Sequence, residues 1–394
     1  MPDADDQPFP WALGVFDAHC HPTDTMAAVP DITSMRARAL TIMATRAQDQ
    51  TLVRQVADSL GVQSRDIDAW GANERVVPCF GWHPWFAHQL YDEALYGGHG
   101  ELAEEQRAQH YEGVFAPGVK REQEAEFLRK LPAPRPLGAF LAELRDALLA
   151  YPLALVGEVG LDKSFRVPVA WGADEHAARD EGLTPGGREG RLLSPHGVAM
   201  AHQRKVLTAQ LNLAGELGRA VSVHGVQAHG VLFETIRETW RGFERVRMSR
   251  RERKRRGVTA EEEAEEEAEE YEEADGKPKP FPPRLCLHSY SGHASQLKQY
   301  FDPSVPVDVF VSFSAAINFS ERGAAAARDA VVAVPEDRLL VESDLHSAGK
   351  DMDEGLEEVV RLVCELRGWG LEEGVKRLRA NWERFVFGRG KRKD

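Results

Sequence analysis

The 394-residue sequence predicts a (β/α)₈ barrel with long loop insertions. Eight short apolar runs rich in β-branched residues recur along the chain, and helical patterns follow several of them. Five of these runs end in a histidine or a carboxylate. In a barrel the carboxyl ends of all strands meet around one mouth, whereas an open doubly wound sheet gathers ligand groups at a switch point. Side chains from strands one, four, five, six and eight converge only in a barrel.

The elements follow in order from these patterns. The predicted strands cover residues 13–19, 39–45, 75–81, 153–158, 219–224, 284–289, 309–314 and 338–343. The predicted helices cover residues 49–60, 139–150, 202–217, 231–241 and 354–367. Gly218 and Gly368 directly follow two of these helices, where glycine commonly ends a helix.

Three connections exceed ordinary loop lengths. Residues 83–138 and 163–200 each follow a strand end, so we expect them to hang over the face where the strands end. Residues 247–283 follow a helix and precede a strand, which places them on the opposite face. Their composition, basic from Arg247 to Arg256 and then acidic from Glu261 to Asp275, is of low complexity. We therefore expect one domain over residues 1–394, with 247–283 as a charged insertion.

Composition narrows the class of protein. The net charge of −14 disfavours non-specific nucleic-acid binding, although cations at a site can still attract phosphate. The four cysteines are scattered without a Cys-x-x-Cys pair, so neither a disulfide framework nor a zinc knuckle is indicated. No secretory signal or membrane-spanning run is evident. We expect a cytoplasmic or nuclear protein with no membrane association; Arg250 to Arg256 is a weak candidate for a nuclear-localisation patch.

The first run ends in Phe16-Asp17-Ala18-His19-Cys20-His21. Alternate residues of a strand point to one side, so His19 and His21 can bind one cation together, while Cys20 faces away. A His-x-His pattern alone is weak. Four other runs strengthen it, because they end in Glu158, His224, His288 and Asp344. Buried strands have no structural reason to end repeatedly in metal-binding side chains, since unpaired groups of this kind are costly to bury.

Together these motifs resemble the TatD family of metal-dependent hydrolases, and within it a fungal subgroup with long insertions. The resemblance covers nearly the whole chain outside the insertions. The matching segments are Phe16 to His21, Gly81-Trp82-His83-Pro84, Gly157 to Asp162, the helix around Gln203 and Gln210, Val223-His224, Leu287 to Gly292, Glu342-Ser343-Asp344, and Asn381 to Phe385. The set is far more specific than any one of its parts.

The resemblance implies a barrel of the metal-dependent hydrolase type that holds two divalent ions. His19, His21 and Asp344 would bind one ion, His224 and His288 the other, and Glu158 would bridge them. Imidazole and carboxylate ligands suit Zn²⁺, Mn²⁺ or Fe²⁺, and Mg²⁺ less well. Glu158 and Asp344 would be catalytic, with Asp344 accepting a proton from a metal-activated water.

Neighbouring residues receive more modest roles. His83 is a candidate contact for a phosphate or a leaving group, with a structural role equally open. Asp17 and Asp162 would orient ligands or a backbone turn rather than bind metal. Val226 stands where the family often has an arginine, which weakens phosphate binding unless Arg166 or another loop residue substitutes.

The implied activity is that of a deoxyribonuclease, which hydrolyses phosphodiesters, with 3′–5′ exonuclease action as one form. DNA would be the substrate. An amidohydrolase-type enzyme acting on a small substrate is the first alternative, because the scaffold alone does not select the bond cleaved. An interaction protein that recruits a partner through 247–283 is the second. Retention of all six ligand positions argues against a dead site.

Overall fold

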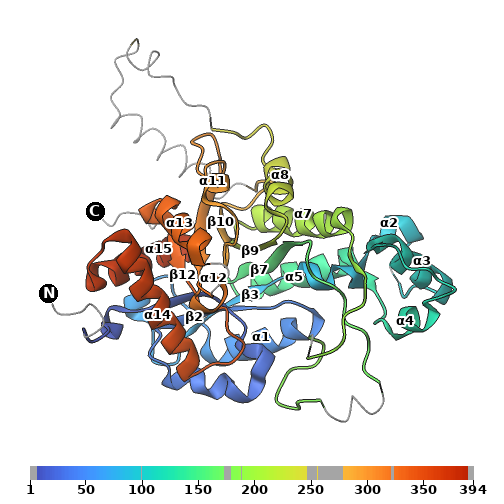
Figure 1. Ribbon diagram of the computed structural model, residues 1–394, viewed down its shortest axis with the longest axis horizontal. Coiled ribbons are helices and arrows are strands. Elements are labelled where there is room, and N and C mark those ends of the chain that lie inside the picture. The colour runs from blue at the N-terminus through green and yellow to red at the C-terminus, as the bar shows by residue number, and fades with distance from the viewer. Residues whose placement is uncertain are drawn as a thin grey trace.

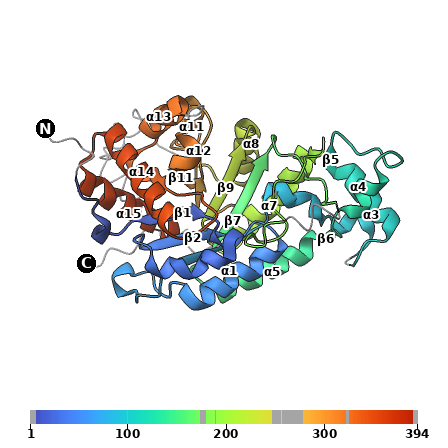
Figure 2. The same ribbon diagram turned by 60° about the horizontal axis from the view of Figure 1, so that its bottom comes forward.

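The computed structural model describes residues 7–98, 100–172, 179–187, 189–245, 255, 278–320 and 324–388. Eight parallel strands form one sheet in the order β1-β2-β3-β7-β9-β10-β11-β12 (Figures 1 and 2). Their bounds are Phe16–Cys20, Ala39–Met43, Val76–Phe80, Leu155–Asp162, Val221–Val226, Arg284–Leu287, Asp308–Phe313 and Leu339–Val341. The predicted barrel is confirmed, and all eight predicted strands are present.

The first and last strands close the barrel by individual bonds near its mouth. The amide of Asp344 donates to the carbonyl oxygen of His19 at 3.0 Å, and the amide of His21 donates to Leu345 at 2.8 Å. β1 starts at Phe16 rather than at residue 13, because Trp11–Leu13 form a 3₁₀ turn and Gly14 has a φ of 85°. The prediction of a longer first strand was therefore wrong at its start.

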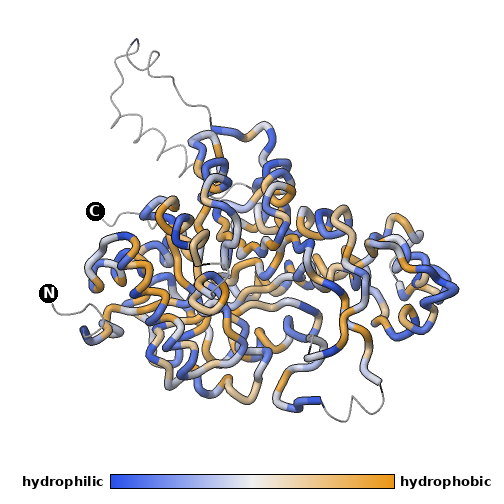
Figure 3. The backbone as a smooth tube through the Cα atoms, in the orientation of Figure 1, coloured by the Kyte–Doolittle hydropathy of each residue, from blue (hydrophilic) through white to orange (hydrophobic). Residues whose placement is uncertain are grey.

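Seven longer helices surround the strands. They are α1 (Ala47–Leu60), α5 (Leu137–Ala150), α7 (Met200–Glu216), α8 (His229–Thr239), α13 (Ala324–Ala333), α14 (Lys350–Arg367) and α15 (Leu371–Phe387). Five of them match the predicted helices; α13 and α15 were not predicted. Hydrophobic residues concentrate in the central strands, and hydrophilic residues on the outer turns (Figure 3). Gly218 and Gly368 both have positive φ after their helices, as expected for glycines that end helices.

Helix α15 covers the end of the barrel where the strands begin. Trp382 stacks on Phe16 with ring centroids 4.5 Å apart, and its Nε1 donates to Thr41 Oγ1 at 3.1 Å. Phe385 packs near Phe310 in the same buried cluster. This end of the barrel is therefore filled with apolar side chains, which leaves the opposite end for polar groups.

The first two long connections contain secondary structure of their own. Residues 83–138 contain η5 (Pro84–Gln89), β4 (Leu90–Tyr91), α2 (Glu93–Tyr96), α3 (Glu104–Val114), β5 (Phe115–Ala116), α4 (Ala125–Lys130) and β6 (Arg135–Pro136). Helices α2 to α4 lie beside the barrel (Figure 1). In the next long connection, β8 (Gly197–Val198) pairs antiparallel with β5, which joins the two insertions.

Most of the charged insertion, 247–283, lies outside the described residues, as does most of the basic patch Arg250 to Arg256. The chain up to Arg245 and the last residues of the insertion, 278–283, are described. The amide of Arg245 donates to Ser304 before β11, and the amide of Lys279 donates to Gly215 at the end of α7. Both anchor points lie toward the face where the strands begin. Among the described residues, no helix combines the length and apolar character needed to cross a membrane.

Candidate metal centre

Six side chains meet at the mouth of the barrel, five from strand ends or the segments after them and Glu158 from the middle of a strand. His19 comes from β1 and His21 directly follows it, Glu158 comes from within β7, and His224 comes from β9. His288 directly follows β10, and Asp344 lies in the loop after β12, beyond Glu342 and Ser343. All are buried except Asp344, whose side chain is 14% exposed. The structure thus brings together every residue that the sequence predicted as a ligand.

One set of donor atoms surrounds a common point near β1. His19 Nε2 and His21 Nε2 are 3.1 Å apart. Glu158 Oε2 lies 3.5 Å from the first and 3.3 Å from the second, and Asp344 Oδ1 lies 3.8 and 3.5 Å from them. A tetrahedral ion with ligands at 2.0–2.1 Å has donor–donor edges of about 3.4 Å. The spacing of these atoms fits such an ion.

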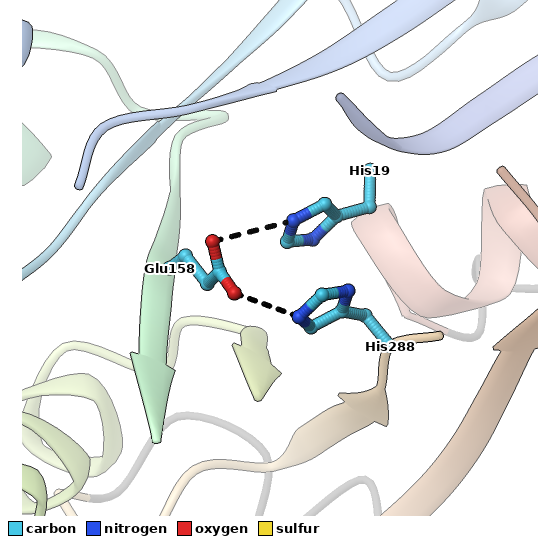
Figure 4. A group of neighbouring side chains, drawn as sticks. All are labelled: His19, Glu158 and His288. Carbon is cyan, nitrogen blue, oxygen red and sulfur yellow. Dashed lines mark hydrogen bonds and ion pairs between the residues drawn. The ribbon is translucent and has the colours of Figure 1, made fainter. Parts of the chain in front are cut away.

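A second set gathers on the other oxygen of Glu158. His288 Nε2 lies 2.7 Å from Glu158 Oε1, His224 Nδ1 lies 2.9 Å from it, and the two nitrogens are 3.3 Å apart. Figure 4 shows the Glu158 carboxylate facing His19 and His288, with one oxygen directed to each. Their two imidazole rings are parallel, with centroids 3.7 Å apart. Glu158 therefore contributes one oxygen to each set of donors.

These groupings could hold divalent metal ions. Within the described residues, His19-His21-Asp344 and His19-Glu158-His288 each place one ligand atom per residue within 4.8 Å of the others. Neutral imidazoles and carboxylates together suit borderline divalent cations. The donor chemistry and the spacing agree, so the residues fit the ions that the sequence motifs imply.

The ligand histidines are oriented by buried partners. His19 Nδ1 lies 2.8 Å from Ser222 Oγ, which leaves Nε2 to face the donor set. Asp162 Oδ2 accepts from His224 Nε2 at 3.1 Å and from Trp85 Nε1 at 2.6 Å. Burial alone would raise the pKa of Asp162, but these hydrogen bonds outweigh it and hold the pKa well below its usual value.

Asp17 binds the backbone rather than a histidine ring. Its Oδ1 accepts from the amides of His19 at 3.0 Å and Ser343 at 3.1 Å. It thereby connects β1 to the loop that carries Asp344. Burial raises the pKa of Asp17 to about 7.

Cys20 lies on the other side of β1. Its thiol faces the carbonyl oxygen of Thr41, as the alternation of Cys20 with His19 and His21 predicts.

His83 also reaches the cluster. Its Nε2 lies 3.1 Å from Glu158 Oε1, and its Nδ1 accepts from the amide of Trp85 at 3.2 Å. That bond places the proton of the neutral ring on Nε2. Burial lowers the pKa of His83 to about 4, so the ring stays neutral near pH 7. His83 is thus a neutral hydrogen-bond donor directed at the centre.

Sequence reasoning did not assign a role to Glu342. This fully buried carboxylate accepts from the amide of Ser289 at 2.7 Å and from its hydroxyl at 2.6 Å, and it also accepts from Ser312. Its Oε1 lies 3.5 Å from His288 Nδ1. Glu342 therefore fixes the backbone on which His288 and Ser289 sit. In the sequence, the available indication of a role at this site was that Glu342 lies two residues before the predicted ligand Asp344.

The centre opens into a cavity of about 990 Å³. The connections 83–138 and 163–200 both line the cavity, which confirms that they lie over the mouth of the barrel. Val226 also lines it, at the position where an arginine was expected. Cationic side chains reach the cavity from elsewhere: Arg46, Lys130, Arg166 and Arg191. Arg166 donates to the carbonyl oxygens of Lys163, Ser164 and Phe165.

Comparison with known proteins agrees with this geometry. The family model described as TatD related DNase matches residues 16–387. The chain belongs to this family. It is 35% identical over 373 residues to the Cut9-interacting protein scn1 of Schizosaccharomyces pombe, covering 94% of this chain and 98% of that protein. It is also 26% identical over 270 residues to an uncharacterized deoxyribonuclease of Saccharomyces cerevisiae, covering 67% of this chain and 64% of that protein.

Solved structures show the same fold. A TatD family hydrolase from Entamoeba histolytica superposes with a TM-score of 0.51 at 10% identity, over 95% of this chain and 99% of that one. An uncharacterized amidohydrolase from Saccharomyces cerevisiae superposes with a TM-score of 0.53 at 13% identity, with the same coverage. The predicted TatD membership is confirmed, and the TatD-family chain is a deoxyribonuclease-type hydrolase acting on ester bonds.

Proposed function

We propose that this TatD-family protein hydrolyses phosphodiester bonds at DNA ends with two divalent cations. The carrying observation is that Glu158 directs one oxygen to the donor set of His19 and His21 and the other to that of His224 and His288. A carboxylate shared in this way offsets the repulsion between two cations at the spacing that suits a phosphoryl group. The reaction, direction of cleavage and number of ions are parts of the proposal.

The ligand roles follow from the two donor sets. His19, His21 and Asp344 would hold one ion, His224 and His288 would hold the other, and Glu158 would offer one oxygen to each. Bound divalent cations supply a water nucleophile near neutral pH and polarise the phosphoryl oxygens. Zn²⁺, Mn²⁺ and Fe²⁺ fit the mixed imidazole and carboxylate donors better than Mg²⁺ does.

Other groups complete the chemistry. Asp344 would take the proton that the attacking water loses, and it would return a proton to the leaving oxygen as the bond from phosphorus to that oxygen breaks. Ser289 Oγ lies 3.1 Å from Asp344 Oδ2 and orients that carboxylate. The neutral His83 donates its Nε2 proton in a hydrogen bond to a phosphoryl or leaving oxygen. Arg46 and Arg166 supply positive charge for backbone phosphates in place of the arginine absent at Val226.

A nuclease assay with and without chelator tests this function. The metal-loaded protein is mixed with end-labelled single-stranded and duplex DNA, with 5′ or 3′ labels to reveal direction. We expect stepwise shortening from the 3′ end, which stops with EDTA and returns with Mn²⁺. Intact DNA together with hydrolysis of a small amide or lactone would replace the nuclease by the amidohydrolase alternative.

We also propose that residues 247–283 bind a protein partner. The relative from Schizosaccharomyces pombe is named for its interaction with Cut9, and this chain covers 98% of it. The charged composition of 247–283 supports binding to a protein surface of complementary charge. We also propose that the protein is located in the cytoplasm or the nucleus, with the basic stretch Arg250 to Arg256 as the signal for nuclear import. Imaging of a tagged chain with and without that stretch tests this.

A further inference from the structure

Two aromatic rings lie directly beside the metal centre. Trp85 and Phe165 stack with centroids 4.5 Å apart and planes 8° apart. Both are partly exposed and line the cavity, whereas most large aromatic residues of this chain are buried. Trp85 in turn meets His83 edge-on at 4.7 Å. The stack therefore begins at the edge of the ligand cluster and extends into the cavity.

The stack is held in place by the same carboxylate that orients His224. Asp162 Oδ2 accepts from Trp85 Nε1 at 2.6 Å. Asp162 Oδ1 accepts from the amides of Ser164 at 2.7 Å and Phe165 at 2.9 Å. One side chain thus fixes both the indole and the turn that carries Phe165. This is an arrangement that holds an aromatic surface at a constant distance from the metal centre.

The surroundings of Phe165 suit a flat apolar group with a nearby phosphate. Among the described residues, Trp85 is the one aromatic neighbour of Phe165, so Trp85 occupies one of its faces. The cavity beside it is lined by Phe127, Leu131 and Pro132 from the preceding insertion. Arg166, the next residue along the chain, adds a cation to the lining. A nucleobase stacks on such a ring in a manner that tolerates any base, because every base has a π face.

We propose that Phe165, supported by Trp85, is a stacking platform for the nucleobase next to the phosphate being cleaved. The platform rests on the proposed function for its ligand class, a nucleic-acid strand end. It makes Phe165 a residue that sets substrate specificity: phosphodiesters that carry a base are preferred over those that carry none. Stacking of one base changes affinity by about 5- to 150-fold.

Binding of a fluorescent strand tests the platform. The probe is a single-stranded 8-mer with 2-aminopurine as its terminal base, at the 3′ end in one version and the 5′ end in another, with hydrolysis-resistant phosphorothioate linkages. Stacking on an aromatic ring quenches 2-aminopurine. Wild type should quench one version. Phe165→Leu, which keeps an apolar side chain without a π face, should lose the quenching and bind about 5- to 150-fold more weakly.

Two controls separate stacking from general damage. Phe165→Trp should restore quenching, and Phe243→Leu, at a 51% exposed aromatic residue that does not line the cavity, should behave as wild type. An 8-mer with an abasic end should bind wild type and Phe165→Leu equally. Unchanged binding and quenching in Phe165→Leu, or no quenching of either version by wild type, would overturn the platform. Quenching by wild type without hydrolysis of the unmodified strand would instead overturn the nuclease function, while base stacking on Phe165 would stand.

Discussion

Asp162 holds His224 by a hydrogen bond of 3.1 Å from Nε2 of the imidazole to Oδ2 of the carboxylate. The bond keeps the proton on Nε2, so Nδ1 presents its lone pair to the centre, 2.9 Å from Glu158 Oε1. A residue that binds no metal in the proposed mechanism thus decides which nitrogen of His224 can do so.

Asp162→Asn should therefore weaken metal binding. An amide accepts the His224 proton less strongly and can turn its NH₂ toward the ring, so we expect a loss of about 10- to 100-fold in metal affinity. Titration of Mn²⁺ or Zn²⁺ against a fluorescent chelator measures it. Asp302→Asn is the matched control, because Asp302 also caps a local turn, at Ser304, but on the exposed surface. Equal affinities in both variants would contradict the assigned role.

Glu158→Gln should nearly abolish hydrolysis while the protein still folds. The carboxylate offsets charge between two cations, and a neutral amide of the same shape cannot. Turnover of labelled DNA and the circular dichroism spectrum are the measurements. Glu358→Gln, on the exposed side of α14, should change neither. A wild-type rate in folded Glu158→Gln would show that Glu158 is not the bridge.

Deletion of residues 247–280 with a short Gly/Ser joint should leave hydrolysis intact. The amide of Arg245, just before the deleted segment, bonds to Ser304, and the amide of Lys279, near the end of that segment, bonds to Gly215. Both contacts lie toward the end of the barrel away from the metal centre. Loop-closure cost changes by roughly 0.6 kcal/mol per doubling of length, so stability should survive. Removal of the acidic tract should raise activity at low salt and lose that advantage as salt screens charge. A large fall in turnover of the folded deletion variant would place the insertion in the active site.

The buried His110 should make stability depend on pH. Burial lowers its folded pKa to about 4, against an ordinary value near 6.5 in the unfolded chain. Between these two pH values the unfolded state therefore binds more protons than the folded state. The contribution of His110 to the free energy of unfolding is thus fully present above about pH 6.5 and is lost as the pH falls toward 4. From pH 7 to 5 this one group should remove about 2 kcal/mol. In urea unfolding, the free energy of unfolding of His110→Gln should change between pH 7 and 5 by that amount less than the free energy of wild type. An equal change in both proteins would refute the lowered pKa of His110.

Much of the barrel and the ligand set could be predicted from sequence because the signals are local. Each strand is a short apolar run. Five of the six ligands lie at strand ends or shortly after them: His19, His21, His224, His288 and Asp344. A barrel necessarily brings those ends together. Membership then follows from the combination of motifs rather than from any one of them.

Two of the features that sequence analysis missed depend on residues that are distant in the sequence, whereas a third does not. Glu342 lies beside a predicted ligand, but its role depends on Ser289, in the turn after β10, and on Ser312, in β11. The stack of Trp85 on Phe165 joins two loops whose contact no local pattern reveals. The helix from Leu371 to Phe387 did carry a local signal, since Val375, Leu378, Trp382 and Phe385 recur at helical spacing and are buried.

The most direct test of the two-ion centre is a stoichiometric titration of metal into metal-free protein, followed by hydrolysis of end-labelled single-stranded DNA. Protein stripped with EDTA and then freed of chelator should have no activity. Activity should rise with added Mn²⁺ and reach its plateau near two equivalents per chain, with Glu158→Gln inactive throughout. Full activity in the stripped protein would contradict metal-dependent hydrolysis. A plateau at one equivalent would contradict the shared role of Glu158 between two ions.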